Sequence, residues 1–282
     1  MAKTPVKKPP VRGRQESKVV ALRPGNDQVP DYVRRQTKQG RGVSSAAEDN
    51  LVPMIAVLQP LSPQLNKHNE GKYIEDAEPG SILVRGMDPE VTDELIFQHC
   101  HFSKSIVEWI PRSKGGGFVG RHLTWPKDMV TGKSDDGRRT IMQTSSGNHL
   151  IETRYHVGHV IAPDGTMLPY IIPFSSTGHT VSRSWMNMMN AVRLEGGIIP
   201  DAWTRLYRLT TVQRQNAAGV WYVLNPQPAG WATPDQALKG EELYESFERG
   251  EKTYGEEEET GIDPGPSEHE DEKPTKGRGK KF

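Results

Sequence analysis

Hydrophobic positions in the second half of the chain follow a helical period over one segment. Between residues 179 and 194, large apolar side chains recur at spacings near four, which places them on one stripe of an α-helix. The pair Gly196-Gly197 and Pro200 follow this stripe and predict that the helix ends there. The stripe consists of Val181, Trp185, Met188 and Val192.

Around this helix the pattern changes to short runs of β-branched and aromatic residues bounded by turn residues, which predicts β-strands. One turn is Pro163-Asp164-Gly165, and a hairpin loop is predicted at Gln215 to Gly219. The predicted helix falls between the third and the fourth strand. The strands are predicted at residues 97–110, 152–162, 167–175, 203–212 and 219–225.

Three strands, a helix and two further strands is the order of elements in the OB fold. The sequence therefore predicts a mainly β protein with one helix, built as an OB-like five-stranded barrel. Another small α+β sheet with the same order of elements is the alternative. Before this unit, the apolar run from Leu51 to Pro63 is interrupted by prolines, so we expect an extended segment packed on the domain rather than a central strand.

Charge is segregated along the chain, although 36 Lys and Arg balance 36 Asp and Glu. Basic residues dominate from Met1 to Arg41, and acidic residues dominate from Glu241 to Glu272. Neither end has the apolar periodicity needed to offset the entropy of ordering. We therefore expect a disordered basic arm (1–49), one OB-like domain (50–249) and a disordered acidic tail with a basic end (250–282).

Several classes of protein are disfavoured by the composition. No apolar run approaches the length of a membrane span, the N-terminus has no hydrophobic signal region, and Cys100 is the single cysteine. These features favour a cytoplasmic protein without membrane contact.

Signals for catalysis or for a bound metal are weak. His99, Cys100 and His101 are adjacent, and strand alternation would place the two histidines on one face, but the spacings of a structural zinc site are missing. The glycine-rich stretch Ser113 to Gly120 lacks the Gly-Lys-Ser/Thr ending of a phosphate-binding loop. Acidic residues of the middle are scattered, and no nucleophile motif is present. We expect no cofactor, no metal and no enzymatic activity.

Basic and aromatic residues alternate in three stretches of the middle region, as expected of a protein that binds single-stranded nucleic acid through phosphates and stacked bases. The strongest candidates are Phe118 and Trp125, which fall in a long, basic, glycine-rich loop (111–140) with little apolar company. In contrast, Trp109, Trp185 and Trp221 are expected in the core. The candidate nucleic-acid-binding residues are Arg112, Lys114, Phe118, Arg121, His122, Trp125, Arg138, Arg139, Arg154, His156, Arg205, Tyr207 and Arg214.

The segments from Leu51 to Phe247, such as KSIVEWIPRSKGGGFVGRH and PYIIPFSSTGHTVSRSWMNMM, resemble a group of bacteriophage proteins described as single-stranded-DNA-binding or as uncharacterised. The resemblance implies an OB-like DNA-binding protein of phage replication or recombination. Such proteins often carry an acidic tail that ends in an aromatic residue. This chain ends in Phe282 but has basic residues from Lys276 to Lys281 beside it.

Together these observations predict a non-enzymatic protein that binds and protects single-stranded DNA in the cytoplasm of the host cell. The acidic tail is expected either to compete with DNA for the basic groove or to contact replication and recombination proteins. The alternative function is that of a phage virion structural or assembly protein, in which the basic arm and the acidic tail contact other virion subunits.

Overall fold

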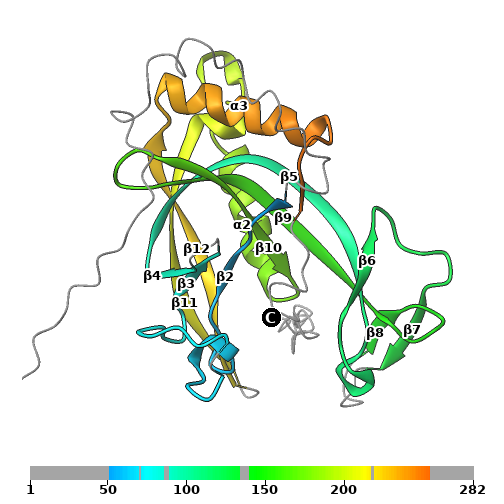
Figure 1. The fold of residues 1–282 in the computed structure, drawn as a ribbon. Coiled ribbons are helices and arrows are strands. Elements are labelled where there is room, and N and C mark those ends of the chain that lie inside the picture. Colours follow the sequence, from blue (N-terminus) through cyan, green and yellow to red (C-terminus); the bar gives the residue numbers. More distant parts are fainter. Residues whose placement is uncertain (1–50, 70, 86–88, 134–139, 217–218, 255–282) are drawn as a thin grey trace, which may run out of the picture. The chain divides into compact units, whose positions relative to one another are not determined.

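The computed structural model (Figure 1) describes residues 51–69, 71–85, 89–133, 140–216 and 219–254. The predicted basic arm (1–49) lies outside these residues, and so does the predicted tail from residue 255 onward. The sequence predicts that the disordered tail begins at residue 250, but residues 250–254 are described and include the short strand β13 (Thr253–Tyr254).

Two long antiparallel strands organise the domain. β5 (Leu95–Trp109) and β9 (His149–Ile161) pair along nearly their whole length. At the start of β5, its outer edge pairs with β11 (Arg205–Asn216), which pairs in turn with β12 (Gly219–Trp231). β10 (Met167–Ser175) pairs with the free side of β9. The strand order at this end, which we call the core end, is therefore β12-β11-β5-β9-β10.

The other end of the β5–β9 pair carries a small extension formed by the connection between the two strands. β6 (Phe118–His122) pairs with the last residues of β5. β8 (Thr140–Gln143) pairs with the first residues of β9, and β7 (Val130–Lys133) pairs with β8. We call residues 110–148 the β6–β8 extension; Figure 1 shows it away from α3 and β12. The segment predicted as one long loop at 111–140 thus contains β6, β7 and the start of β8, and that prediction is corrected.

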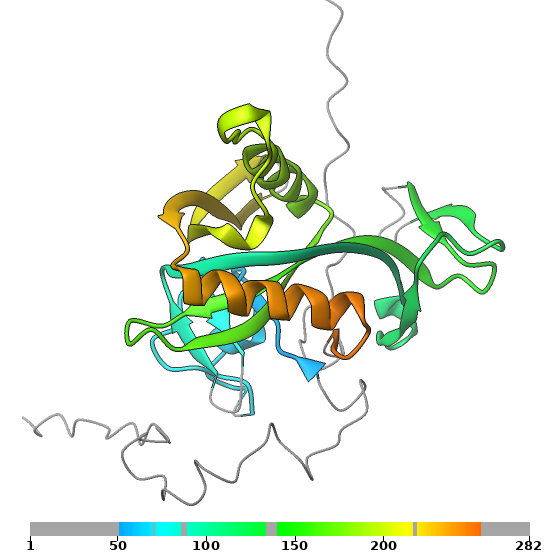
Figure 2. The ribbon, with the colours of Figure 1, turned by 90° about the horizontal axis from the view of Figure 1, so that it is seen from above.

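A β-bulge bends the central pair of strands. The register of β5 against β9 shifts between His99 and His101, so that Cys100 is the extra residue. Gly158 lies opposite His99, and a Cβ atom there would be 2.0 Å from the backbone oxygen of Gln98. Only glycine therefore fits at this position. Figures 1 and 2 show the resulting curvature of β5.

The bulge also changes which face the neighbouring side chains occupy. His99 contacts Trp185 of helix α2 (Gly178–Asn190). Cys100 and His101 both lie on the side of helix α3 (Pro234–Glu248), where His101 stacks on Phe247. The prediction that His99 and His101 share one face is therefore wrong, because alternation fails at a bulge.

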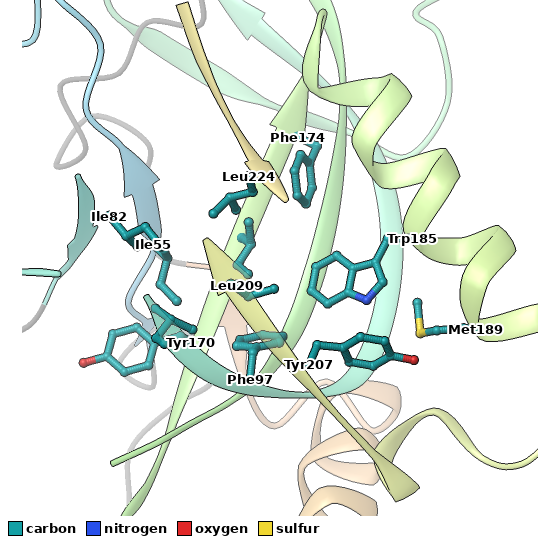
Figure 3. Close-up of a cluster of buried hydrophobic side chains, with 12 residues drawn as sticks. Ile55, Ile82, Phe97, Tyr170, Phe174, Trp185, Met189, Tyr207, Leu209 and Leu224 are labelled. Carbon is teal, nitrogen blue, oxygen red and sulfur yellow. The ribbon is translucent and has the colours of Figure 1, made fainter. Parts of the chain in front are cut away.

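Two hydrophobic cores lie on the two faces of the sheet. On the side of α2, Trp185 packs among residues such as Phe97 and Tyr207 (Figure 3). On the opposite side, Leu243 of α3 packs against Val107 and other strand residues. Figure 2 shows α2 and α3 on different sides of β5. The core placement expected for Trp109 and Trp185 is confirmed, since they are 5% and 1% exposed. Trp221 is only partly buried and does not belong to either core, which corrects the same expectation for it.

The predicted helix is present but shorter, because α2 ends at Asn190 rather than Leu194. The second helix, α3, was missed. Its start is fixed by a capping box, in which the Thr233 side chain accepts from the Gln236 backbone and the Gln236 side chain accepts in return, with proline in the first turn. Gly240 lets α3 approach β5, since a Cβ there would be 2.7 Å from Nε2 of Gln98 and 2.6 Å from Cβ of Trp203.

The apolar run at the start of the described chain is an extended segment packed on the domain, as predicted. β1 (Leu51–Val52) pairs with β13 in parallel. Met54 then forms a bridge with Ile171 of β10, and the Gln59 side chain donates to the backbone oxygen of Tyr222 of β12 at 2.9 Å. The segment thus links the two outer strands of the core end.

A small three-stranded antiparallel sheet joins this segment to the start of β5. It consists of β2 (Ile55–Val57), β3 (Ile82–Val84) and β4 (Glu90–Thr92), in that order. The turn before β3 contains Gly80 in the left-handed region (φ 98°), and its backbone oxygen accepts from Thr211 of β11. Pro79-Gly80 is therefore a turn that leads into β3 and is held against β11.

The fold is mainly β, as the sequence predicts, and its two larger sheets are antiparallel. It differs from the prediction in two ways: the described residues contain two helices, α2 and α3, and the sheets do not close into a barrel. In the described part of the chain, no ladder joins β10 to β12. Neither helix is long and apolar enough to cross a membrane.

Candidate nucleic-acid interface

The β6–β8 extension holds most of the candidate residues, and its surface is basic and partly apolar. Trp125 is 40% exposed in the turn between β6 and β7. Exposed apolar side chains accompany it, above all Leu123, which is 93% exposed. The exposed cations of the described extension are Lys114, Lys127 and Lys133.

Phe118 and Arg121 form a stacked group at the base of the extension. The guanidinium carbon of Arg121 lies 5.3 Å from the ring centroid of Phe118 and 5.7 Å from that of Tyr155. Phe118 also meets Trp109 edge-on, with centroids 5.8 Å apart. Phe118 is therefore half-buried against the core, which corrects the expectation that it has little apolar company.

Side-chain hydrogen bonds hold the extension to the end of the β5–β9 pair. Glu108 of β5 accepts from Nε2 of His122 at 2.8 Å and from Nδ2 of Asn148 at 2.6 Å. The Lys114 ammonium donates to the backbone oxygen of Ser146 at 3.2 Å. His122 and Lys114 thus help to hold the extension in shape, and a phosphate would have to compete with Glu108 for His122.

Arg154 of β9 is also engaged within the protein. Its Nε donates to Oε1 of Glu152 at 2.9 Å, with side chains 19% and 30% exposed. Burial opposes ionisation of Glu152, but the hydrogen bond and charge of Arg154 hold the pKa of this carboxyl below its usual value. The positive charge of Arg154 is therefore largely balanced at its own site.

His156 and Tyr207, both 0% exposed, belong to the core. His156 stacks on Trp185 with centroids 4.7 Å apart, and its Nδ1 lies 3.0 Å from Nε2 of His99. Its Nε2 bonds to the Ser182 hydroxyl at 2.8 Å. Burial lowers the pKa of His156 well below 6.5, and the neighbouring His99 and Arg154 lower it further. A ring without exposed surface cannot stack on a base, so both residues leave the candidate set.

A second group of basic and aromatic side chains lies at the core end. The guanidinium carbon of Arg205 lies 5.6 Å from the ring centroid of Tyr207 and 5.5 Å from that of Trp231. Trp231 is 55% exposed. Trp231 was not predicted, because the strand that carries it was expected to end at residue 225.

One comparison with known proteins gives a match. Residues 21–253 match the Pam3 phage gp34-like protein family. The chain belongs to this family. No curated protein and no solved structure matches it. The gp34-like family connects the chain to bacteriophages, which confirms the phage part of the predicted resemblance, while the relation to single-stranded-DNA-binding proteins stays a prediction.

Four candidate residues of this gp34-like protein remain, and the structure describes the side chain of only one of them. Arg214 is exposed on β11, near the hairpin end. The side chain of Arg112 and the residues Arg138 and Arg139 lie outside the described part. Among the residues that are described, no three His, Cys, Asp or Glu side chains gather in a way that would hold a metal ion.

Proposed function

We propose that this gp34-like phage protein binds single-stranded DNA without catalysis, during phage DNA replication or recombination in the host cytoplasm. The observation that carries the proposal is Trp125, a 40% exposed indole in an extension whose described exposed charges are mainly lysines. An exposed aromatic face stacks on a base, and nearby cations attract the backbone phosphates. The cation–aromatic group of Arg121 and Phe118 lies in the same extension.

The topology supports the same proposal. When β5, β9, β10, β11 and β12 are taken as strands one to five, helix α2 falls between the third and fourth strands, as in an OB fold. OB folds are partly open, and they bind oligonucleotides with the loop between strands one and two. In this protein the β6–β8 extension occupies that connection. We therefore propose an OB-like domain with an enlarged first loop as its binding element.

The proposal is tested by titrating the full chain with a labelled oligo-dT and following the anisotropy of the label. We expect binding whose affinity falls steeply with salt, because each phosphate contact releases counterions. Trp125→Ala should weaken binding by about 5-fold or more, the loss of one stacked base. Its melting temperature should stay close to that of the wild type, since the side chain is well exposed.

Leu123→Ala is the matched control. Leu123 lies two residues away in the same extension and is 93% exposed, but it has neither a ring nor a charge. Base stacking predicts that this variant binds oligo-dT like the wild type. An intact chain that does not bind oligo-dT at low salt would refute the proposed function.

One observation favours a second function, that of a virion structural or assembly protein. Val119 of β6 and Val130 of β7 are 47% and 43% exposed, close in sequence to the exposed Leu123. In the described part, β6 pairs only with β5, and β7 only with β8. Unpaired edges with apolar side chains are suited to contact with another protein. In that case Leu123→Ala and Trp125→Ala should both reduce incorporation into phage particles, with no DNA binding in either the wild type or the variants.

A further inference from the structure

Trp231 has an exposed aromatic ring that packs against a cation. It lies near the end of β12, directly opposite Arg205 at the start of β11. Arg205 lies between two rings, 5.5 Å from the centroid of Trp231 and 5.6 Å from that of Tyr207. Tyr207 is 0% exposed and Trp231 is 55% exposed, so the stack begins in the core and ends at the surface. A ring held in this way loses little conformational freedom when a ligand stacks on it.

The charge of Arg205 has no acidic partner within the described residues. Its Nε and Nη1 atoms are buried there without a hydrogen bond. Arg208, three residues later on the same strand, instead pairs with Glu94, with Nη1 3.1 Å from Oε2. Unmade hydrogen bonds of a buried charged group cost stability. No carboxylate of the described residues balances the charge of the guanidinium, and this charge can therefore attract an anionic ligand.

We infer that Arg205 and Trp231 form a second contact for single-stranded nucleic acid, in which Trp231 stacks on a base and the charge of Arg205 attracts a backbone phosphate. This inference rests on the proposed function. The contact is separate from the β6–β8 extension, because β11 pairs with Leu95–Gln98 of β5 whereas β6 pairs with Ile106–Trp109.

The two contacts are far enough apart to be separated experimentally. Phe97, opposite Tyr207, and Val107, opposite Arg121, are ten residues apart on β5, about 33 Å along an extended strand. An oligonucleotide too short to span this length reaches one contact at a time. A longer one reaches both, and its affinity then rises through the high effective concentration of the second contact.

The two roles are tested with a long oligo-dT and with an abasic oligonucleotide of equal length. Trp231→Leu should weaken binding of oligo-dT by about 5-fold or more and leave binding of the abasic strand unchanged, because that strand has no bases to stack. Trp231→Phe should restore most of the loss. Arg205→Gln should weaken binding of both probes and lower the salt slope by about 0.7, the value for one phosphate of a single strand.

Arg208→Gln is the matched control for Arg205→Gln, because Arg208 is already paired with Glu94. It should change affinity less than Arg205→Gln. Arg205→Lys keeps the charge and should keep the salt slope. Melting curves show whether each variant is folded. If Arg205→Gln is unfolded, the Trp231→Leu variant alone decides the test.

The outcomes separate this inference from the proposed function. If the wild type binds oligo-dT and the folded Trp231→Leu and Arg205→Gln variants bind it equally well, the second contact is refuted and the proposed function stands. If the wild type binds neither probe at low salt, the proposed function fails, and the inference fails with it.

Discussion

The two ends of the β5–β9 pair show how one pair of strands supports two different environments. At the core end, helices α2 and α3 cover opposite faces, and the side chains between them, such as Trp185 and Phe97, are 1% and 0% exposed. At the other end, the β6–β8 extension has no α-helix in its described part. Its apolar residues stay partly in solvent, with Trp125 40% exposed.

The polar groups of the two ends differ in the same way. At the core end, His99 and His156 are buried and held neutral, since burial lowers the pKa of His99 to about 3 and that of His156 well below 6.5. In the extension, Lys127 and Lys133 are exposed and charged. Coverage by a helix therefore decides whether basic and aromatic side chains become core or stay accessible to a ligand.

The largest expected effect is on the core end. Trp185→Ala should reduce the free energy of unfolding by about 3–5 kcal/mol, as for a large aromatic residue removed from a packed core. The loss arises because Trp185 contacts Phe97, Phe174, His156 and Tyr207. Urea unfolding of the wild type and the variant measures it. A loss below about 1 kcal/mol would contradict the packing described for α2.

The second effect follows from the buried histidine pair. Because the folded-state pKa values of His99 and His156 lie below the usual 6.5, the stability that the neutral rings contribute is complete above that pH and is lost as the pH falls below it. Between pH 6.5 and 5.5 the loss should be about 1 kcal/mol per histidine. His159 adds to this loss, because burial and two nearby lysines lower its pKa to about 4.

Urea unfolding at these two pH values checks the acid effect. His156→Gln should lower stability at pH 6.5 and reduce its dependence on pH, because one buried titrating ring is gone. Phe97→Leu is the control: Phe97 packs against Trp185 in the same core but has no titrating group, so its loss of stability should be the same at both pH values. An equal pH dependence in the wild type and in His156→Gln would show that the buried pair does not cause the effect.

Much of the core end could be predicted from the sequence because its signals are local. β10 spans the residues predicted for it, and Trp185 is buried on α2 as predicted. The other buried residues of α2 are Ser182 and Met189, whereas Val181 and Met188 of the predicted stripe are partly buried and Val192 lies beyond the helix. β12 continues to Trp231 beyond its predicted end, across Pro226 and Pro228. Prolines are tolerated there because β12 is at the edge of the sheet.

The features that were missed depend on distant partners or on competing signals. The bulge at Cys100 lies opposite Gly158 of β9, which is more than fifty residues later in the chain. The strands of the extension are only four or five residues long, and the hydrogen bond between Glu108 and His122 helps to hold them. Helix α3 was missed because its acidic composition resembles the start of the tail, although the sequence from Thr233 to Gln236 carries the signature of a capping box.

The candidate site was predicted in part, for the same reason. Trp125 and the lysines of the extension are exposed, as a ligand-binding role requires. His156 and Tyr207 have the right residue types but lie on faces that α2 covers, with Trp185 against both rings. Residue type and local charge indicate candidates, but the packing of a helix on the sheet decides which of them reach the surface.

The smallest expected effect lies at the boundary between the two environments. Phe118 packs edge-on against Trp109 but is half-exposed in the extension. Phe118→Ala should therefore cost about 1–2 kcal/mol of unfolding free energy, less than the full cost for a buried phenylalanine. Its neighbour Val119 is 47% exposed, and Val119→Ala should stay within about 0.5 kcal/mol of the wild type. Thermal and urea unfolding of both variants measure the difference. Equal effects of the two substitutions would place Phe118 with the exposed residues of the extension, and the boundary would then lie nearer to Trp109.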